Sequence, residues 1–254
     1  MKVVTITNQK GGTGKTSTAL YLTYGLARKG KKVLLIDLDQ QADASFSFHV
    51  PYRQDETTFQ VLTEKISLKD IIVKVNDDID LAPASPELAQ LDVLLTGKLD
   101  PQFILEDNMK DLMGTYDYVV IDTPPSLNMA VLNALTASQS VVVPTQADIY
   151  SLKGLKDLAS TVNSIKRRSN PELKIDGILI SRYNSRTVFT KAITSALEEM
   201  ALELHTTVFE SKIREAIAVK EAQNNFQSIF EYEPRGKVTE DIEAFINEFL
   251  TKEK

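Results

Sequence analysis

Cysteine is absent from this chain of 254 residues. Its absence excludes a disulfide scaffold, a cysteine-ligated zinc or iron–sulfur site and a thiol nucleophile. No hydrophobic run reaches the roughly 20 residues that a membrane-spanning helix needs, and residues 1–6 lack the pattern of a signal peptide. The two histidines, His49 and His205, have no second ligand at metal-binding spacing. We therefore expect a cytoplasmic protein that needs neither disulfides nor a structural metal to fold.

A strong excess of charge of either sign is also missing. The net charge is −6, and charged residues make up 25% of the chain beside 43% hydrophobic residues. These values are typical of a globular protein and argue against a general nucleic-acid binder. Residues 1–150 hold 13 Lys or Arg against 19 Asp or Glu, whereas residues 151–254 hold 16 of each. A local basic surface in the second part is therefore compatible with the acidic total.

Short apolar runs, often β-branched, alternate with segments of helical period. The runs cover residues 3–7, 33–37, 118–122, 140–143, 175–181 and 207–209. The helical segments cover residues 15–29, 151–168, 188–204 and 238–250. Because the apolar runs are continuous rather than alternating, they are typical of parallel strands covered by helices on both faces.

We therefore predict a three-layer α/β fold in which helices flank a mostly parallel sheet. Residues 1–254 are expected to form a single domain. Residues 45–115 are its least regular part and are expected to wrap an edge of the sheet.

A glycine-rich segment, residues 9–16, lies between the first predicted strand and the first predicted helix. Its three glycines let the backbone bend until several N–H groups converge on phosphate oxygens. The helix N-terminus that follows adds partial positive charge. Lys15 is placed to neutralise phosphate charge, and the hydroxyl of Thr16 to bind Mg²⁺. The segment therefore predicts a phosphate loop for a nucleoside triphosphate.

This loop departs from the usual spacing in two ways. Gln9 stands where the motif usually begins with glycine, and Lys10 is a second lysine inside the loop. Lys10 comes too early to share the position of Lys15. A cation at this position can reach a phosphate of its own subunit or of a second subunit.

Acidic residues follow two of the predicted strands. Asp37 and Asp39 come where the second strand ends, and Asp122 comes where the third ends. The carboxyl ends of parallel strands face the ligand crevice of an open α/β sheet. Asp122 is expected to hold the water shell of Mg²⁺ beside the phosphate loop.

The sequence K-G-G-T-G-K-T at residues 10–16 resembles the deviant Walker A motif of the ParA/MinD family of ATPases. The resemblance extends over nearly the whole chain. It implies a P-loop ATPase whose signature lysine, here Lys10, crosses a sandwich dimer to touch the nucleotide of the other subunit. In the family motif D-x-D-P-Q the second aspartate positions or activates the attacking water. Asp39 matches that aspartate, although Gln40 stands where proline is usual.

The resemblance also assigns the candidate site residues. The catalytic candidates are Lys10, Lys15, Asp39 and Asp122. The candidate Mg²⁺ ligands are Thr16, Asp39 and Asp122. The candidate ATP contacts are Lys10, Gly11, Gly12, Thr13, Gly14, Lys15, Thr16 and Ser17. Residues 176–187 are similar to the segment that holds the adenine in the family, which adds Arg182 and Tyr183; surface packing is an equal alternative for both.

Several branches of the family are distinguished by features that this sequence lacks. Iron–sulfur members need cysteines, and the tyrosine-kinase members end in a tyrosine cluster, whereas the last tyrosine here is Tyr232. MinD-like members end in a basic amphipathic membrane helix, but the polar face of residues 239–250 is acidic, which an anionic membrane repels. Long ParA members carry a helix-turn-helix before the phosphate loop, and we expect none here. The sequence is therefore similar to the short, Soj-like ParA proteins, and we expect no membrane partner.

Such a resemblance implies a homodimer that forms on ATP binding and then binds DNA without sequence specificity. It further implies association with the nucleoid and weak ATP hydrolysis that a ParB-like, centromere-binding partner stimulates, so that plasmid or chromosomal DNA is segregated. The candidate DNA contacts are Arg186, Arg214, Lys212, Lys220 and Lys191. For each lysine, a solvated surface role is an equal alternative.

Two other functions stay open at this point. The first is a MinD-like or protein-cluster positioning ATPase, which would share the nucleotide residues and lack ATP-dependent DNA binding. The second is a small-molecule synthetase on the same P-loop scaffold, which would turn over only with a small acid substrate.

Overall fold

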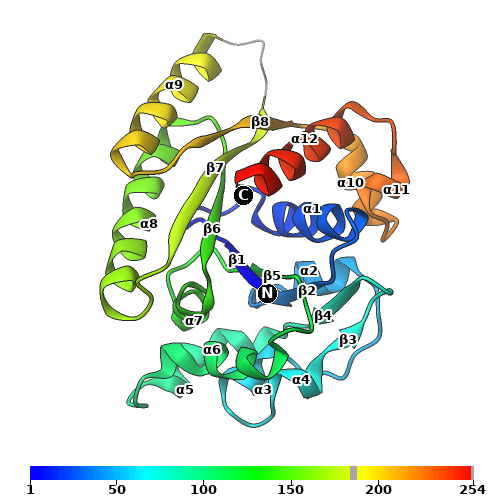
Figure 1. Ribbon diagram of the computed structural model, residues 1–254, viewed down its shortest axis with the longest axis vertical. Coiled ribbons are helices and arrows are strands. Elements are labelled where there is room, and N and C mark those ends of the chain that lie inside the picture. The colour runs from blue at the N-terminus through cyan, green and yellow to red at the C-terminus, as the bar shows by residue number, and fades with distance from the viewer. Residues whose placement is uncertain (184–187, 253–254) are drawn as a thin grey trace.

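An eight-stranded sheet forms the centre of the computed structural model, which describes residues 1–183 and 188–252 (Figure 1). The strand order is β3-β4-β2-β5-β1-β6-β7-β8, and every neighbouring pair is parallel except β3 and β4. The strands are β1 (Lys2–Ile6), β2 (Val33–Asp37), β3 (Val73–Lys74), β4 (Ile79–Ala82), β5 (Tyr118–Asp122), β6 (Ser140–Thr145), β7 (Lys174–Tyr183) and β8 (Val208–Arg214). The predicted fold class is confirmed.

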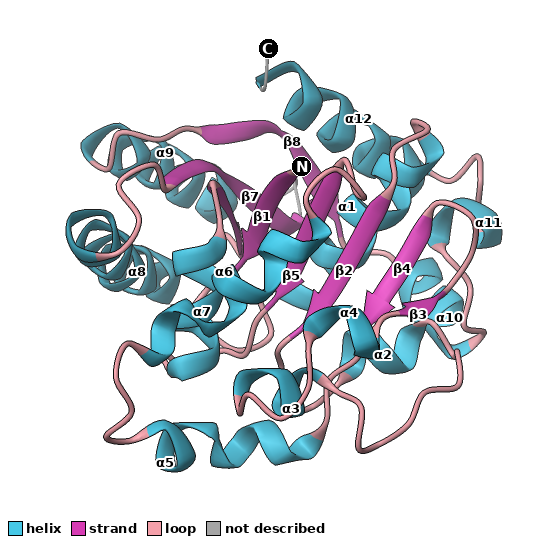
Figure 2. Ribbon diagram, turned by 60° about the horizontal axis from the view of Figure 1, so that its bottom comes forward, coloured by secondary structure: helices cyan, strands magenta, loops and turns pink. Residues whose placement is uncertain are grey.

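Helices connect the strands and cover both faces of the sheet (Figure 2). The longer ones are α1 (Lys15–Arg28), α7 (Met129–Ala137), α8 (Ile149–Arg168), α9 (Val188–Glu203), α10 (Ile217–Asn224) and α12 (Lys237–Lys252). The short ones are α2 (Asp43–Ser47), α3 (Thr58–Leu62), α4 (Leu68–Ile71), α5 (Leu91–Leu95), α6 (Ile104–Met109) and α11 (Ile229–Tyr232), with 3₁₀ turns at Pro86–Gln90, Pro101–Phe103 and Lys110–Leu112. Among the described residues, no helix is long and apolar enough to cross a membrane.

The two faces of the sheet bury alternate residues of the same strands, as the pleat requires. Val4 packs into the core beneath α1 and α12, whereas its neighbour Val3 packs into the core beneath the short helices of residues 58–112. On the β6–β7 side, α7, α8 and α9 enclose a third cluster with Val141 and Val143. Because both faces are covered, the strands are apolar throughout.

The C-terminal helix α12 docks on this core. Five of its apolar side chains are buried, namely Val238, Ile242, Phe245, Ile246 and Phe249. The apolar face of this amphipathic segment is therefore occupied by the core. Two acidic residues of its polar face contact β8: Asp241 pairs with Arg214, and Glu248 accepts from the N–H groups of Glu210 and Ser211.

A glycine sets how closely α1 and α12 approach. A Cβ added at Gly25 would lie 2.5 Å from Cγ1 of Ile246. Gly25→Ala is therefore expected to lower the free energy of unfolding by about 1–2 kcal/mol, because overpacking outweighs the gain in helix propensity. Gly154→Ala in α8 is the matched control, since its added Cβ would meet only Asn8 Oδ1 at 3.8 Å. Urea unfolding checks both variants, and equal stabilisation by both would contradict the packing argument.

The structure differs from the predicted elements in two places that affect the site. The strand predicted at residues 207–209 continues to Arg214, so Lys212 and Arg214 lie on β8 rather than in a loop. Residues 45–115 contribute β4, a strand that the sequence did not indicate, and β4 pairs in parallel with β2. This segment therefore extends the sheet as well as wrapping its edge.

Candidate functional site

The glycine-rich loop joins β1 to α1 at the carboxyl edge of the sheet. Gly12 and Gly14 have φ angles of +73° and +88°, a left-handed conformation that residues with a Cβ rarely adopt. Gly14 is the residue that caps α1. The first-turn N–H groups of α1 therefore open toward the space enclosed by the loop, which is the arrangement that binds phosphate.

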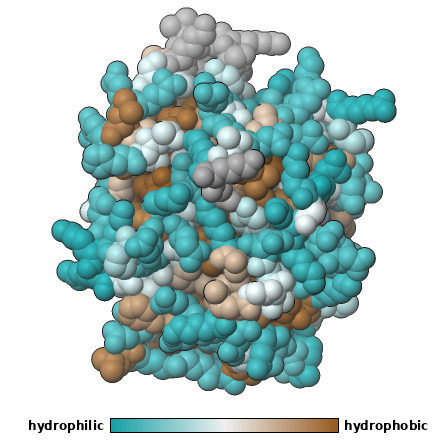
Figure 3. Space-filling model, viewed as in Figure 1, coloured by the Kyte–Doolittle hydropathy of each residue, from teal (hydrophilic) through white to brown (hydrophobic). Residues whose placement is uncertain are grey.

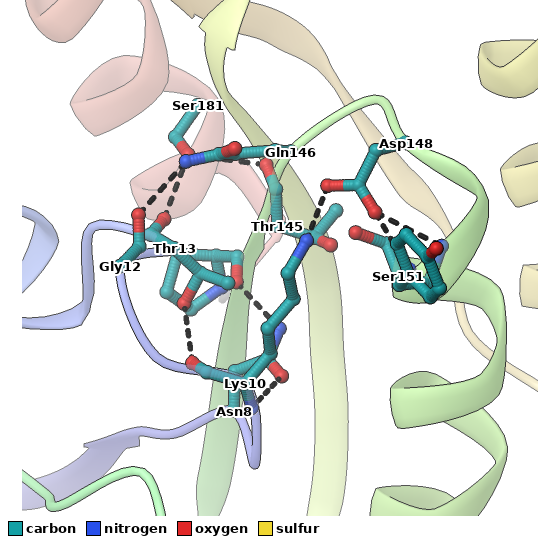
Figure 4. A network of polar contacts seen from close by, with 11 residues as sticks. Asn8, Lys10, Gly12, Thr13, Thr145, Gln146, Asp148, Ser151 and Ser181 are labelled. Carbon is teal, nitrogen blue, oxygen red and sulfur yellow. Dashed lines mark hydrogen bonds and ion pairs between the residues drawn. The ribbon is translucent and has the colours of Figure 1, made fainter.

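Hydrogen bonds to β6, to β7 and to Gln146, the residue after β6, hold this loop in place (Figure 4). Ser181 Oγ donates to the carbonyl of Thr13 at 2.7 Å, and Gln146 Nε2 donates to the carbonyl of Gly12 at 2.8 Å. Asn8 donates to the carbonyl of Pro144 at 2.8 Å. These bonds turn the loop carbonyls away from the enclosed space. Because they join segments more than 130 residues apart in the sequence, no motif indicated them.

Lys15 is nearly buried, with an exposed fraction of 7%. Its Nζ donates to the carbonyl of Lys10 at 3.2 Å. Burial lowers the pKa of this ammonium, while the charges of Asp122 and Asp39 act in the opposite direction. A desolvated cation of this kind gains most from an anionic partner, and a phosphate group bound in the loop supplies one.

Two buried carboxylates meet where β2 and β5 end. Asp37 and Asp122 are register partners on these adjacent strands, and neither is exposed to solvent. Asp37 accepts hydrogen bonds from the backbone N–H of Asp39 and from both N–H and Oγ of Ser45. Burial raises the pKa of Asp37 to about 6 despite these bonds. Asp37 is therefore tied into the fold, and its oxygens are already occupied.

Asp122 is different, because its Oδ2 has no hydrogen-bond partner although it is buried. Burial raises the pKa of this carboxyl well above its ordinary value, and the charge of Asp37 raises it further. The hydroxyl of Thr16 hydrogen-bonds to it and acts in the opposite direction. An orphaned buried oxygen beside a phosphate loop fits a cation or its water shell.

The other predicted metal ligand, Asp39, lies on the loop after β2. Its exposed fraction is 9%, and its Oδ1 accepts a hydrogen bond from the N–H of Gln41. Over residues 1–183 and 188–252, no three His, Cys, Asp or Glu side chains converge as a metal cluster. A Mg²⁺ ion here would therefore depend on phosphate oxygens and water in addition to Thr16 and Asp122, which is the usual arrangement for this ion.

Lys10 does not point into the loop. Its side chain extends to Asp148, with which it forms an ion pair, and its Nζ lies 6.0 Å from the ring centroid of Tyr150 (Figure 4). Asp148 also caps α8 by accepting from the N–H groups of Tyr150 and Ser151. The sequence analysis missed Asp148; an Asp directly before a helical segment is an N-cap signal, but nothing local indicates its contact with Lys10.

A pocket opens beside the phosphate loop, between α1, the end of β7 and α10. Arg182, one of the two residues predicted to contact the adenine, lines it and has a left-handed φ of +50°. Tyr183 does not line it; its ring instead receives Lys212 Nζ, 5.0 Å from the centroid. The remaining lining residues are Gly14, Ser17, Thr18, Tyr21, Ser181, Ile213, Arg214, Glu215, Ala216, Val219, Lys220 and Gln223. Its position, directly beside the phosphate loop, suits a nucleoside attached to loop-bound phosphates.

Comparison with known proteins identifies the family. The family described as "AAA domain" matches residues 1–175. The "Sporulation initiation inhibitor protein Soj" of Bacillus subtilis (strain 168) is 33% identical over 241 residues, which is 94% of each chain. The "Chromosome partitioning protein ParA" of Myxococcus xanthus is 31% identical over 256 residues, covering 99% of this chain and 89% of that protein. This chain belongs to the ParA family of ATPases.

Solved structures of similar proteins cover two activities. A putative plasmid partition protein from Borrelia burgdorferi B31, bound to AMPPNP, is 26% identical over 99% of both chains with a TM-score of 0.83. A cobyrinic acid a,c-diamide synthase from Mycobacterium smegmatis, with a bound ATP analogue and magnesium, is 30% identical, covers 78% of this chain and 82% of its own, and has a TM-score of 0.74. The ParA fold thus supports nucleotide binding in proteins of different function.

The residues predicted from the ParA resemblance to contact DNA lie in different surroundings in the structure. Arg214 pairs with both carboxylate oxygens of Asp241, at 2.6 and 2.7 Å, and Lys212 lies over Tyr183. Lys220 lines the pocket beside the phosphate loop. Arg186 and the side chain of Lys191 lie outside the described residues. The described members of this set therefore do not form one outward-facing row, and their role in DNA binding stays a prediction.

Proposed function

We propose that the chain is a ParA-type partition ATPase. Two subunits join on binding ATP, the dimer binds DNA without sequence specificity, and a ParB-like partner stimulates weak ATP hydrolysis. Support comes from family membership, from the nucleotide-bound partition protein of similar structure and from the geometry of the phosphate loop.

The position of Lys10 is the observation that best supports an ATP-dependent dimer. The loop already holds Lys15 beneath the position of the phosphates, so a second lysine is not needed within the subunit. Lys10 instead stands at the rim with its side chain 31% exposed, held by a single carboxylate (Figure 4). A lysine there can exchange that carboxylate for a phosphate presented by a facing subunit.

Each residue of the site then has a chemical task. The N–H groups of residues 11–16 and the ammonium of Lys15 hold the phosphates, and Arg182 lines the space for the nucleoside. Thr16 and Asp122 would hold Mg²⁺, which neutralises phosphate charge when bound. Asp39 orients the attacking water at the end of the phosphate chain. Positioning and charge neutralisation supply most of the rate in phosphoryl transfer.

Hydrolysis can be transmitted to the protein surface through the loop after β2. Asp39 stands on this loop, and Asp37 just before it bonds to Ser45 at the start of α2. Loss of the terminal phosphate removes the contact that holds Asp39, so the loop and α2 are free to move together. The dimer then opens and releases DNA.

Binding to a nonspecific DNA duplex at low salt tests this proposal. The full chain is compared without nucleotide, with ADP–Mg²⁺ and with ATP–Mg²⁺, by fluorescence anisotropy. We expect binding at least ten-fold tighter with ATP than in the other two states, with a strong dependence on salt. An ATP-dependent dimer that ignores DNA in all three states would overturn DNA as the partner and favour a positioning ATPase.

The similarity to a cobyrinic acid a,c-diamide synthase keeps a small-molecule synthetase as the second candidate. ATP turnover distinguishes the two. A partition ATPase hydrolyses ATP slowly by itself and faster with DNA and a ParB-like protein. A synthetase instead needs a small carboxylic acid, and its ATP turnover does not respond to DNA.

A further inference from the structure

A basic groove runs between α8 and α9, away from the nucleotide site. It is lined by Lys156, Ala159, Ser160, Asn163, Lys166, Arg167, Glu203 and Leu204. Three cations face one carboxylate there, although the whole chain carries a net charge of −6. The local excess of cations is therefore opposite in sign to the net charge of the chain.

Four polar members of the groove form a single stripe on α8. Lys156, Ser160, Asn163 and Arg167 follow one another at spacings of four, three and four residues, which places them on one face of a helix. At 1.5 Å per residue, the stripe is roughly 16 Å long. The opposite face of α8 holds the buried residues Leu155, Leu158, Val162 and Ile165, so this stripe is fixed in direction by the core.

The three cations of the groove are available for a ligand. Within the described residues, no ion pair involves Lys156, Lys166 or Arg167, whereas Arg214 is held by Asp241 on both oxygens. The helix dipole accounts for cations in the last turn of α8, where Lys166 and Arg167 lie. It does not account for Lys156, which lies near the middle of the helix.

The composition of the groove favours a phosphodiester backbone over an acidic protein surface. Ser160 and Asn163 are neutral hydrogen-bond donors between the cations, which is the mixture that contacts phosphate oxygens in DNA complexes. Among the side chains that the structure describes, no aromatic one lines the groove, so these residues offer no platform for base stacking and no aromatic anchor for a protein partner. Binding of this kind reads no sequence.

We propose that the α8–α9 groove is a DNA-backbone contact surface of this protein, and this proposal rests on the partition function proposed above. In a dimer, each subunit presents one such groove.

The test is a salt titration of duplex DNA binding in ATP–Mg²⁺. The double variant Lys156→Ala/Arg167→Ala is compared with Lys69→Ala/Arg235→Ala, which removes one exposed lysine and one exposed arginine elsewhere. We expect the groove variant to bind at least ten-fold more weakly and its slope of log K against log salt to fall by about 2, one unit for each lost phosphate contact. The control should match the wild type, and all proteins should form the ATP-dependent dimer.

Two results would overturn the proposal in different ways. If the wild type binds DNA and the groove variant binds with the same affinity and salt slope, the groove is not a DNA contact. The proposed function as a partition ATPase is then unaffected. If the wild type fails to bind DNA with ATP–Mg²⁺, the groove proposal and the proposed function fail together.

Discussion

Lys10→Ala is expected to abolish the ATP-dependent dimer at micromolar concentration while nucleotide binding stays within a few-fold of the wild type. The reason is geometric, because Lys15 holds the phosphates within the subunit whereas Lys10 points outward to Asp148. Loss of one partner of a partly buried charge pair across an interface costs about 2–5 kcal/mol, or roughly 30- to 4,000-fold in dimer affinity. Sedimentation of the protein with ATP–Mg²⁺, together with titration of a fluorescent nucleotide, measures both quantities.

Asp148→Asn provides the opposing variant. Asparagine keeps the N-cap that Asp148 provides for α8 but removes the charge that competes for Lys10. Dimer affinity should therefore rise by a few-fold instead of falling. If Lys10→Ala dimerises normally, Lys10 does not act across the interface. If Asp148→Asn weakens the dimer, Asp148 positions Lys10 rather than competing for it.

Asp122→Asn is expected to change stability and activity in opposite directions. Oδ2 of Asp122 is buried without a partner next to Asp37, so its negative charge is unfavourable in the nucleotide-free protein. Asparagine should leave the free energy of unfolding unchanged or raise it by about 1–2 kcal/mol. Hydrolysis of ATP should fall about 100-fold or more, because the site loses its carboxylate for Mg²⁺.

Thermal unfolding with and without ATP–Mg²⁺ separates the two effects. Wild-type stability should rise by about 2.7 kcal/mol at a ligand concentration of 100 Kd, and most of this gain should be lost in the variant. Asp37→Asn is the control, because Asp37 accepts three hydrogen bonds and its amide would face the donors of Ser45. This control should lose about 1–3 kcal/mol. An Asp122→Asn protein that is destabilised yet still responds to Mg²⁺ would contradict the assignment.

Continuous apolar runs were sufficient to predict most of the sheet. The strands around Val4, Leu35 and Val120 are buried on both faces, so they carry a strong local signal. The strand β4 was missed because it has only four residues and begins directly after the polar segment 76–78. It becomes a strand by pairing with β2, a contact that no local pattern shows.

The residues of the candidate site were likewise predicted where the signal is local and missed where it depends on distant contacts. Gly14, Lys15 and Thr16 were identified from consecutive residues, because a phosphate loop must have its donors and cation next to one another. Asp148 was missed because it lies 138 residues from Lys10. For Tyr183 the sequence left adenine contact and surface packing as equal alternatives, and it could not show that Lys212 lies over the ring, because this contact depends on β8 pairing with β7.

The sequence by itself determined the family, the phosphate loop and the parallel sheet, since each depends on the chemistry and spacing of neighbouring residues. Only the tertiary structure decided that Asp122 is left with an unpaired oxygen, that Lys10 is held by Asp148 and that Arg214 is paired with Asp241. It also decided that the cations of α8 stand unpaired beside α9 in an acidic protein. Charge acts through space rather than along the chain, so the partner of each ionised group is set by the packing of distant segments.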